Sequence, residues 1–414
     1  MERWGVRGVV GVTVALLLAG ACGGDTTPIR SGGGEGDAVT VGAALSLTGK
    51  LAREGILTRE GYDHCAEVVN QKGGVQVGER RMPLRLRYQD DQSTPDVASR
   101  LVDQMQAQGV TLLLGPYGSA STEAAAAVVE KNSQVMVEGA GADDQIFTRG
   151  YRTTFAVLSP ASQYLTSIVR AVNELAVPKP ASVAVISADD GFSKTAAEAG
   201  KAEAERLGMT VVGLEYVPNG TTDVSAALTK IRARHPDLLL GSVHLQEGVA
   251  IVRQSQELGL DPAGGFGETV APPTPDFVNT LGRAAEYVLG SSQWTPETGG
   301  QDPIFGTAAD YVAGFRSRFG RDPEYHNAEA TAACLALVLA VQQARSTDPK
   351  KVRDALAGLD TDSFFGRIRF DGTGKNTSKP MSVIQVQDGK AVTVWPVGPR
   401  TQRLRWPTPP FSRR

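Results

Sequence analysis

The sequence is short of cysteine, histidine and net charge. Its 414 residues include three cysteines and four histidines, and the formal net charge is −3. Neither a zinc-ligand spacing nor a Cys-x-x-Cys pair occurs, which argues against a metal centre or a thiol redox site. The slightly negative charge leaves no basic surface for nucleic acid. We therefore expect no metal ion, no cofactor and no nucleic-acid partner.

Common catalytic motifs are also missing. The chain has no Gly-x-Ser-x-Gly, no His-Glu-x-x-His and no phosphate-binding loop, and its histidines are scattered at 64, 235, 244 and 326. Adjacent acids at Asp189 and Asp190 are more typical of a solvated turn than of carboxylate chemistry. We predict that the protein is not an enzyme. Beyond residue 40, no stretch is long and apolar enough to span a membrane.

The N-terminus has the pattern of an export signal. Arg3 and Arg7 precede an apolar run over residues 9–18, and Ala19-Gly20-Ala21-Cys22 follows. A cysteine after small residues resembles the bacterial lipobox, so residues 1–22 are predicted to be a signal peptide with Cys22 as the lipidated residue. Simple cleavage that leaves a free thiol is the alternative. Residues 23–37 are rich in glycine and predict a flexible tether with a reach of about 20 Å.

The other two cysteines lie in helix-like segments far apart in the sequence. Cys65 and Cys334 are the one possible disulfide pair in an exported protein whose Cys22 is acylated. Buried cysteines in helices are more often free thiols. The expectation is therefore two separately buried thiols, with a disulfide as the alternative.

The remaining chain alternates between strand-like and helix-like segments, which predicts two parallel, doubly wound sheets in succession. The stretch over residues 111–122 is typical. An apolar strand leads through Gly115, Pro116 and Gly118 to Ser119 at the start of a helix. Helix N-termini carry unpaired N–H groups and attract anions. Taken alone, this pattern favours a helix cap over a binding residue for Ser119.

Several segments resemble the type I periplasmic binding proteins, in particular the Leu/Ile/Val-binding subunits of ABC importers. They are residues 42–49, 68–75, 88–91, 114–122 and 189–193. Each segment is weak alone, but their order and spacing are similar to the family over residues 38 to 395. The resemblance implies an α/β fold with two Rossmann-like lobes, joined by three hinge strands, that close on a ligand.

The resemblance also implies where each lobe begins and ends. The expected division gives the first lobe residues 38–158 and 291–364, and the second lobe residues 159–290 and 365–398. Residues 399–414 are expected to form a loose C-terminal tail.

In this family an amino-acid ligand is held at both charged ends. Ser119 matches the serine that binds the carboxylate, and Glu268 matches the second-lobe acid that binds the ammonium group. A backbone carbonyl near Ala140 matches a further ammonium ligand. Ser119 and Glu268 are therefore the principal predicted ligand-binding residues.

The surrounding positions depart from the Leu/Ile/Val pattern. Ala142 replaces a threonine, His244 and Arg53 each replace a tyrosine, and Phe192 replaces a tyrosine while keeping its ring. Tyr117, in the same turn as Ser119, completes the predicted site. Arg53 is either a solvated loop residue or a partner for a second anionic group on the ligand. His244 is either a helix-capping residue or a ligand contact.

The resemblance implies an extracytoplasmic, lipid-anchored, monomeric solute-binding subunit of an ABC importer. The predicted ligand is an amino acid or a related small carboxylate, which is delivered to the permease subunits of the importer. Two alternatives stay open. One is a binding protein of the same fold for an aromatic acid or an amide, and the other is a sensor that docks a separate receptor.

Overall fold

The computed structural model describes residues 38–414. The predicted signal peptide, Cys22 and the tether lie outside the described residues. The first sheet is entirely parallel, and its spatial order is β4 (Leu84–Asp90), β1 (Val39–Leu45), β5 (Leu112–Leu114), β6 (Val135–Glu138) and β7 (Thr154–Ala156). The second sheet has the order β18 (Lys390–Trp395), β17 (Ser382–Gln387), β12 (Leu289–Ser292), β11 (Phe266–Glu268), β10 (Leu238–Ser242), β8 (Ser182–Ala188) and β9 (Thr210–Val217).

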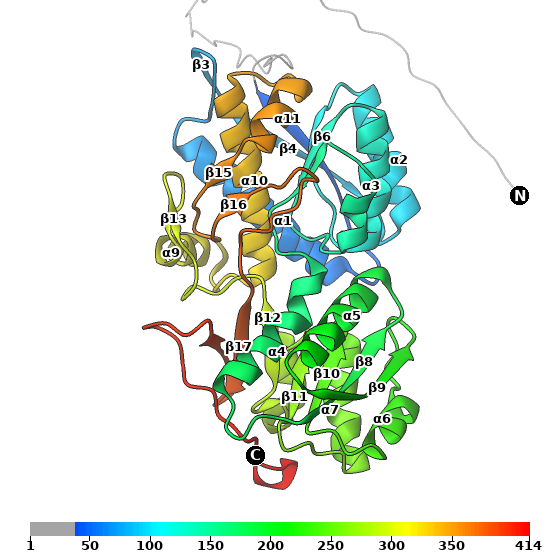
Figure 1. Ribbon diagram of the computed structural model, residues 1–414. Helices are drawn as coiled ribbons and strands as arrows, with labels where there is room; N and C mark the ends of the chain where they lie inside the picture. The colour runs from blue at the N-terminus through cyan, green and yellow to red at the C-terminus, as the bar shows by residue number, and fades with distance from the viewer. Residues whose placement is uncertain (1–37) are drawn as a thin grey trace, which may run out of the picture. The chain divides into compact units, whose positions relative to one another are not determined.

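Helices pack against each sheet, and the sheet with its helices makes one lobe (Figure 1). The first-lobe helices are α1 (Ala52–Gln71), α2 (Pro95–Ala107), α3 (Ser119–Lys131), α9 (Ala308–Phe319), α10 (Tyr325–Ala344) and α11 (Pro349–Ala357). The second-lobe helices are α4 (Tyr164–Leu175), α5 (Gly191–Arg206), α6 (Ser225–Arg232), α7 (Leu245–Leu258) and α8 (Pro275–Leu281). The predicted fold of two Rossmann-like lobes is confirmed. No helix within residues 38–414 is long and apolar enough to cross a membrane.

Strand β17 pairs in antiparallel orientation with both β12 and β18, whereas β12, β11, β10, β8 and β9 are parallel to one another. The two strands form a C-terminal hairpin. Residues 365–376, which precede this hairpin, pack with the first lobe. Phe365, Ile368 and Phe370 pack in the first-lobe core, and Asn376 donates to the backbone oxygen of Val157 at 2.8 Å. The last crossing between lobes therefore lies near Lys379, later than the expected boundary at 364/365.

Three buried residues, one from each crossing between the lobes, are hydrogen-bonded to one another. The side-chain amide of Gln293 accepts from the Ser159 backbone N–H at 2.9 Å and donates to the Ser159 carbonyl at 2.8 Å. The Ser159 hydroxyl donates to the Lys379 carbonyl at 2.8 Å. The Lys379 ammonium group donates to the Gln293 backbone carbonyl. Burial lowers the pKa of Lys379 to about 7, although the charge of Glu329 opposes the shift.

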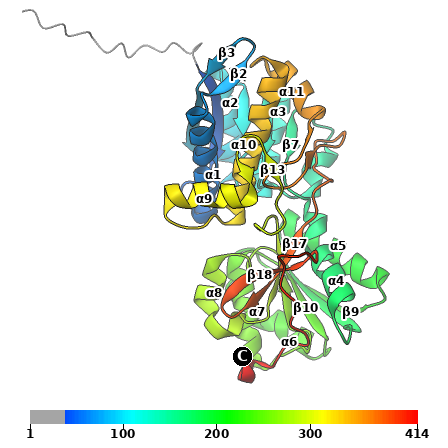
Figure 2. The same cartoon turned by 90° about the vertical axis from the view of Figure 1, so that its left-hand side faces the viewer.

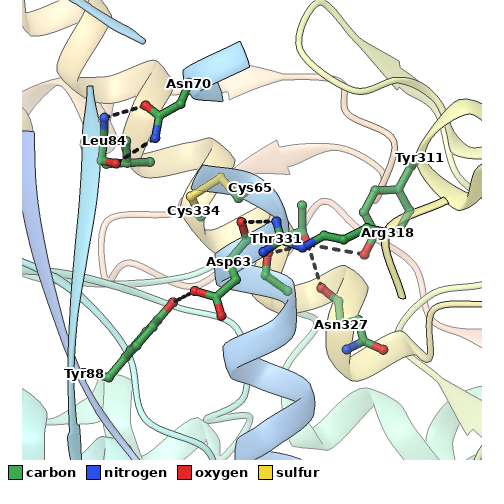
Figure 3. Close-up of a disulfide and its surroundings, with 11 residues drawn as sticks. Asp63, Cys65, Asn70, Leu84, Tyr88, Tyr311, Arg318, Asn327, Thr331 and Cys334 are labelled. Carbon is green, nitrogen blue, oxygen red and sulfur yellow. Dashed lines mark hydrogen bonds between the residues drawn. A yellow bond between two sulfur atoms is a disulfide. The ribbon is translucent and has the colours of Figure 1, made fainter. Parts of the chain in front are cut away.

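Cys65 on α1 and Cys334 on α10 form a disulfide with a Cα–Cα distance of 6.2 Å (Figure 3). The expectation of two separate thiols is therefore wrong. The two helices lie side by side in both overall views (Figures 1 and 2), which brings together residues 269 positions apart. Thr331 of α10 supports the same contact, because its hydroxyl donates to the Gly61 carbonyl at 2.9 Å.

The C-terminal residues are not a loose tail. The Trp406 indole donates to the Pro178 carbonyl at 2.8 Å, and the Thr408 backbone N–H donates to the Ala263 carbonyl at 2.9 Å. The Arg414 side chain is buried and pairs with Asp261 at 3.2 Å. This segment therefore packs on the second lobe. Its proline-rich composition suggested a loose end, but its aromatic and arginine side chains make specific contacts.

His64 is buried among four aromatic rings of the first lobe, those of Phe305, Tyr311, Phe315 and Phe319. Burial, followed by the charge of nearby Arg318, lowers the pKa of His64 from 6.5 to about 4. Protons therefore bind the unfolded chain more tightly than the folded protein. The contribution of neutral His64 to stability is present above pH 6.5 and is lost as the pH falls towards 4.

We expect His64→Phe to reduce the acid sensitivity of the protein, because phenylalanine cannot bind a proton. Between pH 7.5 and pH 5, the variant should lose about 1–2 kcal/mol less unfolding free energy than the wild type. Urea unfolding at the two pH values measures the difference. Equal losses in the two proteins would contradict the low pKa of His64.

Candidate binding site between the lobes

The predicted site residues follow the carboxyl ends of parallel strands in both sheets. Ser119 comes after β5, and Ala140 and Ala142 come after β6. In the second lobe, His244 follows β10, while Glu268 is the last residue of β11. Open parallel sheets bind their ligands at this edge. The sequence order therefore places these residues at the binding edges of the two sheets.

Ser119 is the first residue of α3 and is not its cap, because Gly118 occupies the cap position with a φ of 87°. The left-handed region suits glycine, so the turn before the helix depends on this residue. The Ser119 hydroxyl accepts from the Asp143 backbone N–H at 3.1 Å. Ser119 is half-buried, with the free N–H groups of the first helical turn beside it. Capping of α3 therefore does not explain the serine.

The loop after β6 is held by a buried carboxylate. Glu138 accepts from the backbone N–H groups of Ala140 at 2.8 Å and Gly141 at 2.6 Å. Burial raises the pKa of Glu138 to about 8, although these two bonds oppose the shift. The Ala142 carbonyl accepts from the Ala161 backbone N–H at 2.7 Å, and so does not face a ligand freely. Ala140 is half-buried, whereas Ala142 is buried.

Glu268 is fully buried, and neither of its carboxylate oxygens has a hydrogen-bond partner among residues 38–414. Burial, followed by the charge of Glu247, raises the pKa of Glu268 well above its ordinary value. Glycine at position 248 makes room for the carboxylate, because an added Cβ there would lie 2.4 Å from Glu268 Oε2. An unpaired buried carboxylate of this kind would gain from a cationic partner.

Phe192 and His244 form one wall on the second lobe. Phe192, on α5, packs edge-on against Tyr164 with ring centroids 5.0 Å apart, and the His244 ring lies 5.5 Å from Phe192. His244 Nε2 lies 3.3 Å from Asp190 Oδ2. Although burial opposes it, the bond to Asp190 raises the pKa of His244. His244 directly precedes α7, and its ring is held in place by Asp190. Its side chain is one-third exposed.

Tyr117 belongs to a second aromatic group on the first lobe. Its ring is buried and lies 5.6 Å from that of His326, which stacks on Tyr325 with centroids 3.9 Å apart. Both Tyr325 and His326 are at the start of α10. Neither residue was among the predicted site residues, because the sequence pattern predicts a helix over 327–345 that begins after them. A proline at position 323 marked the earlier start, but nothing in the sequence placed it beside Tyr117.

Polar side chains also join the lobes away from the crossing segments. The Thr195 hydroxyl on α5 donates to Asp143 Oδ1 at 2.9 Å, in the loop that also binds Ser119. Arg53 on α1 donates through Nε to Asp276 on α8. Phe192 and Val270 of the second lobe pack in the same apolar cluster as the first-lobe core. The lobes are therefore in contact around the predicted site.

Arg53 lies within α1, which begins at Ala52, and not in the loop in which the sequence analysis placed it. Its Nη2 donates to both carboxylate oxygens of Glu324, at 3.1 Å and 2.9 Å. Its Nη1 lies 3.8 Å from Glu54 and makes no hydrogen bond within residues 38–414. Arg53 is thus neither a solvated loop residue nor wholly free for a ligand. It is an interlobe residue whose Nη1 has no hydrogen-bond partner in the part of the chain that the structure describes.

Asp276→Asn removes the second-lobe partner of Arg53 while keeping the Glu324 pair intact. Part-buried ion pairs contribute about 1 kcal/mol, so the open arrangement of the lobes should become several-fold more populated. Single-molecule FRET between dyes on α2 and α6 measures the two populations. An unchanged distribution in Asp276→Asn would show that this ion pair does not hold the lobes together.

The described residues also include a cavity of ≈ 220 Å³ away from Ser119. Gln293 and Lys379 of the hinge line it, together with residues 396–401. It lies at the crossings between the lobes and not at the sheet edges.

Two helix-flanked sheets, three crossing segments and polar residues at both sheet edges define a two-lobed binding protein. The sequence pattern of the periplasmic binding protein family matches residues 38–391, and the chain belongs to that family. The resemblance inferred from the sequence is confirmed.

The chain is similar to the Leu/Ile/Val-binding protein homolog 7 of Brucella melitensis. The two are 24% identical over 413 residues, which covers 96% of this chain and 99% of the relative. Two crystal structures share the fold. A leucine binding protein from Thermotoga maritima has a TM-score of 0.76 and 20% identity, covering 86% of this chain and 97% of its own. An isoleucine complex of a branched-chain amino acid transporter substrate binding protein from Streptococcus pneumoniae has a TM-score of 0.71 and 20% identity, covering 86% and 99%.

Proposed function

We propose that this chain is the extracytoplasmic solute-binding subunit of an ABC importer. It captures an amino acid or a related small carboxylate between its lobes and delivers it to the permease. The family and the names of its relatives support this role. One observation carries the ligand assignment. Ser119 stands in the first turn of α3 after a first-sheet strand, and Glu268, whose carboxylate has no partner among residues 38–414, ends a strand of the second sheet.

The two groups suit the two ends of a zwitterion. The ligand carboxylate would accept from the Ser119 hydroxyl and from the first N–H groups of α3. The ligand ammonium would pair with Glu268, whose carboxylate has no other partner among residues 38–414. Ala140, Ala142, Phe192, His244, Tyr117 and Arg53 complete the proposed site. This role is binding and transport, without catalysis.

Cys22 is proposed as the lipid anchor, which would hold the monomeric protein at the outer face of the membrane. Labelling with a radioactive fatty acid tests the anchor. The full chain should incorporate label and Cys22→Ser should not, whereas label in both would place the lipid elsewhere.

A thermal-shift screen of residues 23–414 against amino acids, aromatic acids and amides tests the function. A ligand at 100 times its dissociation constant should stabilise the protein by about 2.7 kcal/mol, which is a clear shift in melting temperature. The protein should first be unfolded and refolded to release any bound solute. A response to aromatic acids alone would favour the alternative ligand class, and no response to any compound would contradict the proposal.

A further inference from the structure

His326 is buried without satisfying its hydrogen-bonding groups. Its ring is 1% exposed, and neither Nδ1 nor Nε2 has a partner among residues 38–414. His244, the other histidine of the site, is paired with Asp190. Buried polar groups are nearly always satisfied in folded proteins, so an unpaired imidazole beside a binding turn points to a partner from outside the chain.

The ring is held firmly in one place. It stacks on Tyr325 and lies against Tyr117, two residues before Ser119. Burial and the charge of Arg53 lower the pKa of His326 to about 3, so its imidazole is neutral near pH 7. A neutral imidazole has one N–H donor and one acceptor nitrogen. It can therefore bind a group that both accepts and donates.

Arg53 offers a second unused donor in the same region. Its Nη1 is buried without a hydrogen bond, and its charge acts on both His326 and Tyr117. The guanidinium is already surrounded by the carboxylates of Glu54, Glu324 and Asp276. A ligand carboxylate at this position would be repelled by three acidic side chains and attracted by one arginine. A neutral oxygen acceptor is the better match for the remaining N–H.

We propose that His326 and Arg53 Nη1 form a subsite for a carboxamide on the ligand side chain, which makes amide amino acids the preferred ligand class. The amide oxygen accepts from Arg53 Nη1, while the amide NH₂ donates to the unprotonated imidazole nitrogen of His326 or to Glu54. This inference rests on the proposed function, because it takes the ligand to be an amino acid held between the lobes.

Isothermal titration calorimetry with L-glutamine, L-asparagine, L-glutamate and L-leucine tests the subsite. The wild type should bind glutamine or asparagine at least tenfold more tightly than glutamate and leucine. His326→Phe keeps the stacked ring and removes both nitrogens. It should weaken binding of the preferred amide at least tenfold while changing leucine affinity less than threefold. His64→Phe, at a buried histidine in the α9 cluster, is the matched control and should leave the amide preference intact.

The outcomes separate this inference from the proposed function. Tighter binding of leucine or glutamate, or an amide preference unchanged in His326→Phe, would overturn the carboxamide subsite and leave amino-acid binding intact. Binding of none of the common amino acids would overturn both. A nitrogen-15 histidine spectrum gives an independent readout, because the His326 nitrogens should shift with glutamine in the wild type and not with leucine. Absence of that shift with glutamine bound would also overturn the subsite.

Discussion

Replacing Cys65 and Cys334 together with alanine should lower the free energy of unfolding by about 2–5 kcal/mol. The disulfide closes a loop between residues 269 positions apart and fixes α1 against α10 in the first lobe. A cross-link of this span restricts the unfolded chain strongly, and its loss leaves two buried positions with smaller side chains. Urea unfolding of the wild type and the double variant measures the change.

A reductant provides the matched control for the disulfide. It should destabilise the wild type to a similar extent and leave the Cys65→Ala/Cys334→Ala variant unaffected, because Cys65 and Cys334 are the two cysteines of residues 38–414. Ligand affinity should change little, since Cys65 and Cys334 lie within α1 and α10 and neither belongs to the predicted site. A loss below about 1 kcal/mol would show that the cross-link contributes little to folding.

Glu268→Gln and Ser119→Ala should each weaken amino-acid binding at least tenfold, which corresponds to about 1.4 kcal/mol. Ser119→Ala removes a hydrogen bond to the ligand carboxylate, and Glu268→Gln removes the negative charge that strengthens the bond to the ligand ammonium. Hydrogen bonds to charged groups contribute about 1.5–3 kcal/mol. Glutamine has the shape of glutamate without its charge, so the fold should be retained. Calorimetry measures the affinity, and melting temperature serves as the control for stability.

Glu268→Gln and Arg53→Ala together discriminate between the two ligand classes. For a ligand without an amino group, Glu268→Gln should have little effect and Arg53→Ala a large one. Unchanged affinity in both Ser119→Ala and Glu268→Gln would contradict the assignment of the binding site. A loss of melting temperature without a loss of affinity would give Glu268 a structural role only.

Apolar strands, glycine turns and helix starts are local signals, and they were sufficient to predict two parallel sheets in succession. The arrangement of these sheets as two lobes was implied by the resemblance to the family. Ser119 illustrates the limit of such signals. Its place after a strand was predicted, but its bond to Asp143 depends on how two neighbouring loops pack. Contacts between residues far apart in the sequence were the hardest to predict. Spacing alone did not show that Cys65 meets Cys334, or that Arg53 reaches Asp276 on the other lobe.

Some residues of the candidate site could not be predicted, because no motif in the neighbouring sequence indicates their role. His326 is a single histidine at the start of an alanine-rich helix, and its importance comes from a ring contact with Tyr117 and two unpaired nitrogens. The packing of the C-terminal segment on the second lobe was missed for a similar reason. Trp406 and Arg414 find partners about 150 to 230 residues earlier in the chain.

A crystal structure with the tightest-binding amino acid would test the central claim most directly. We predict the ligand between the two sheet edges, with its carboxylate within hydrogen-bonding distance of the Ser119 hydroxyl and its ammonium beside Glu268. A ligand bound elsewhere, for example in the hinge cavity lined by Gln293 and Lys379, would contradict the assignment of the site.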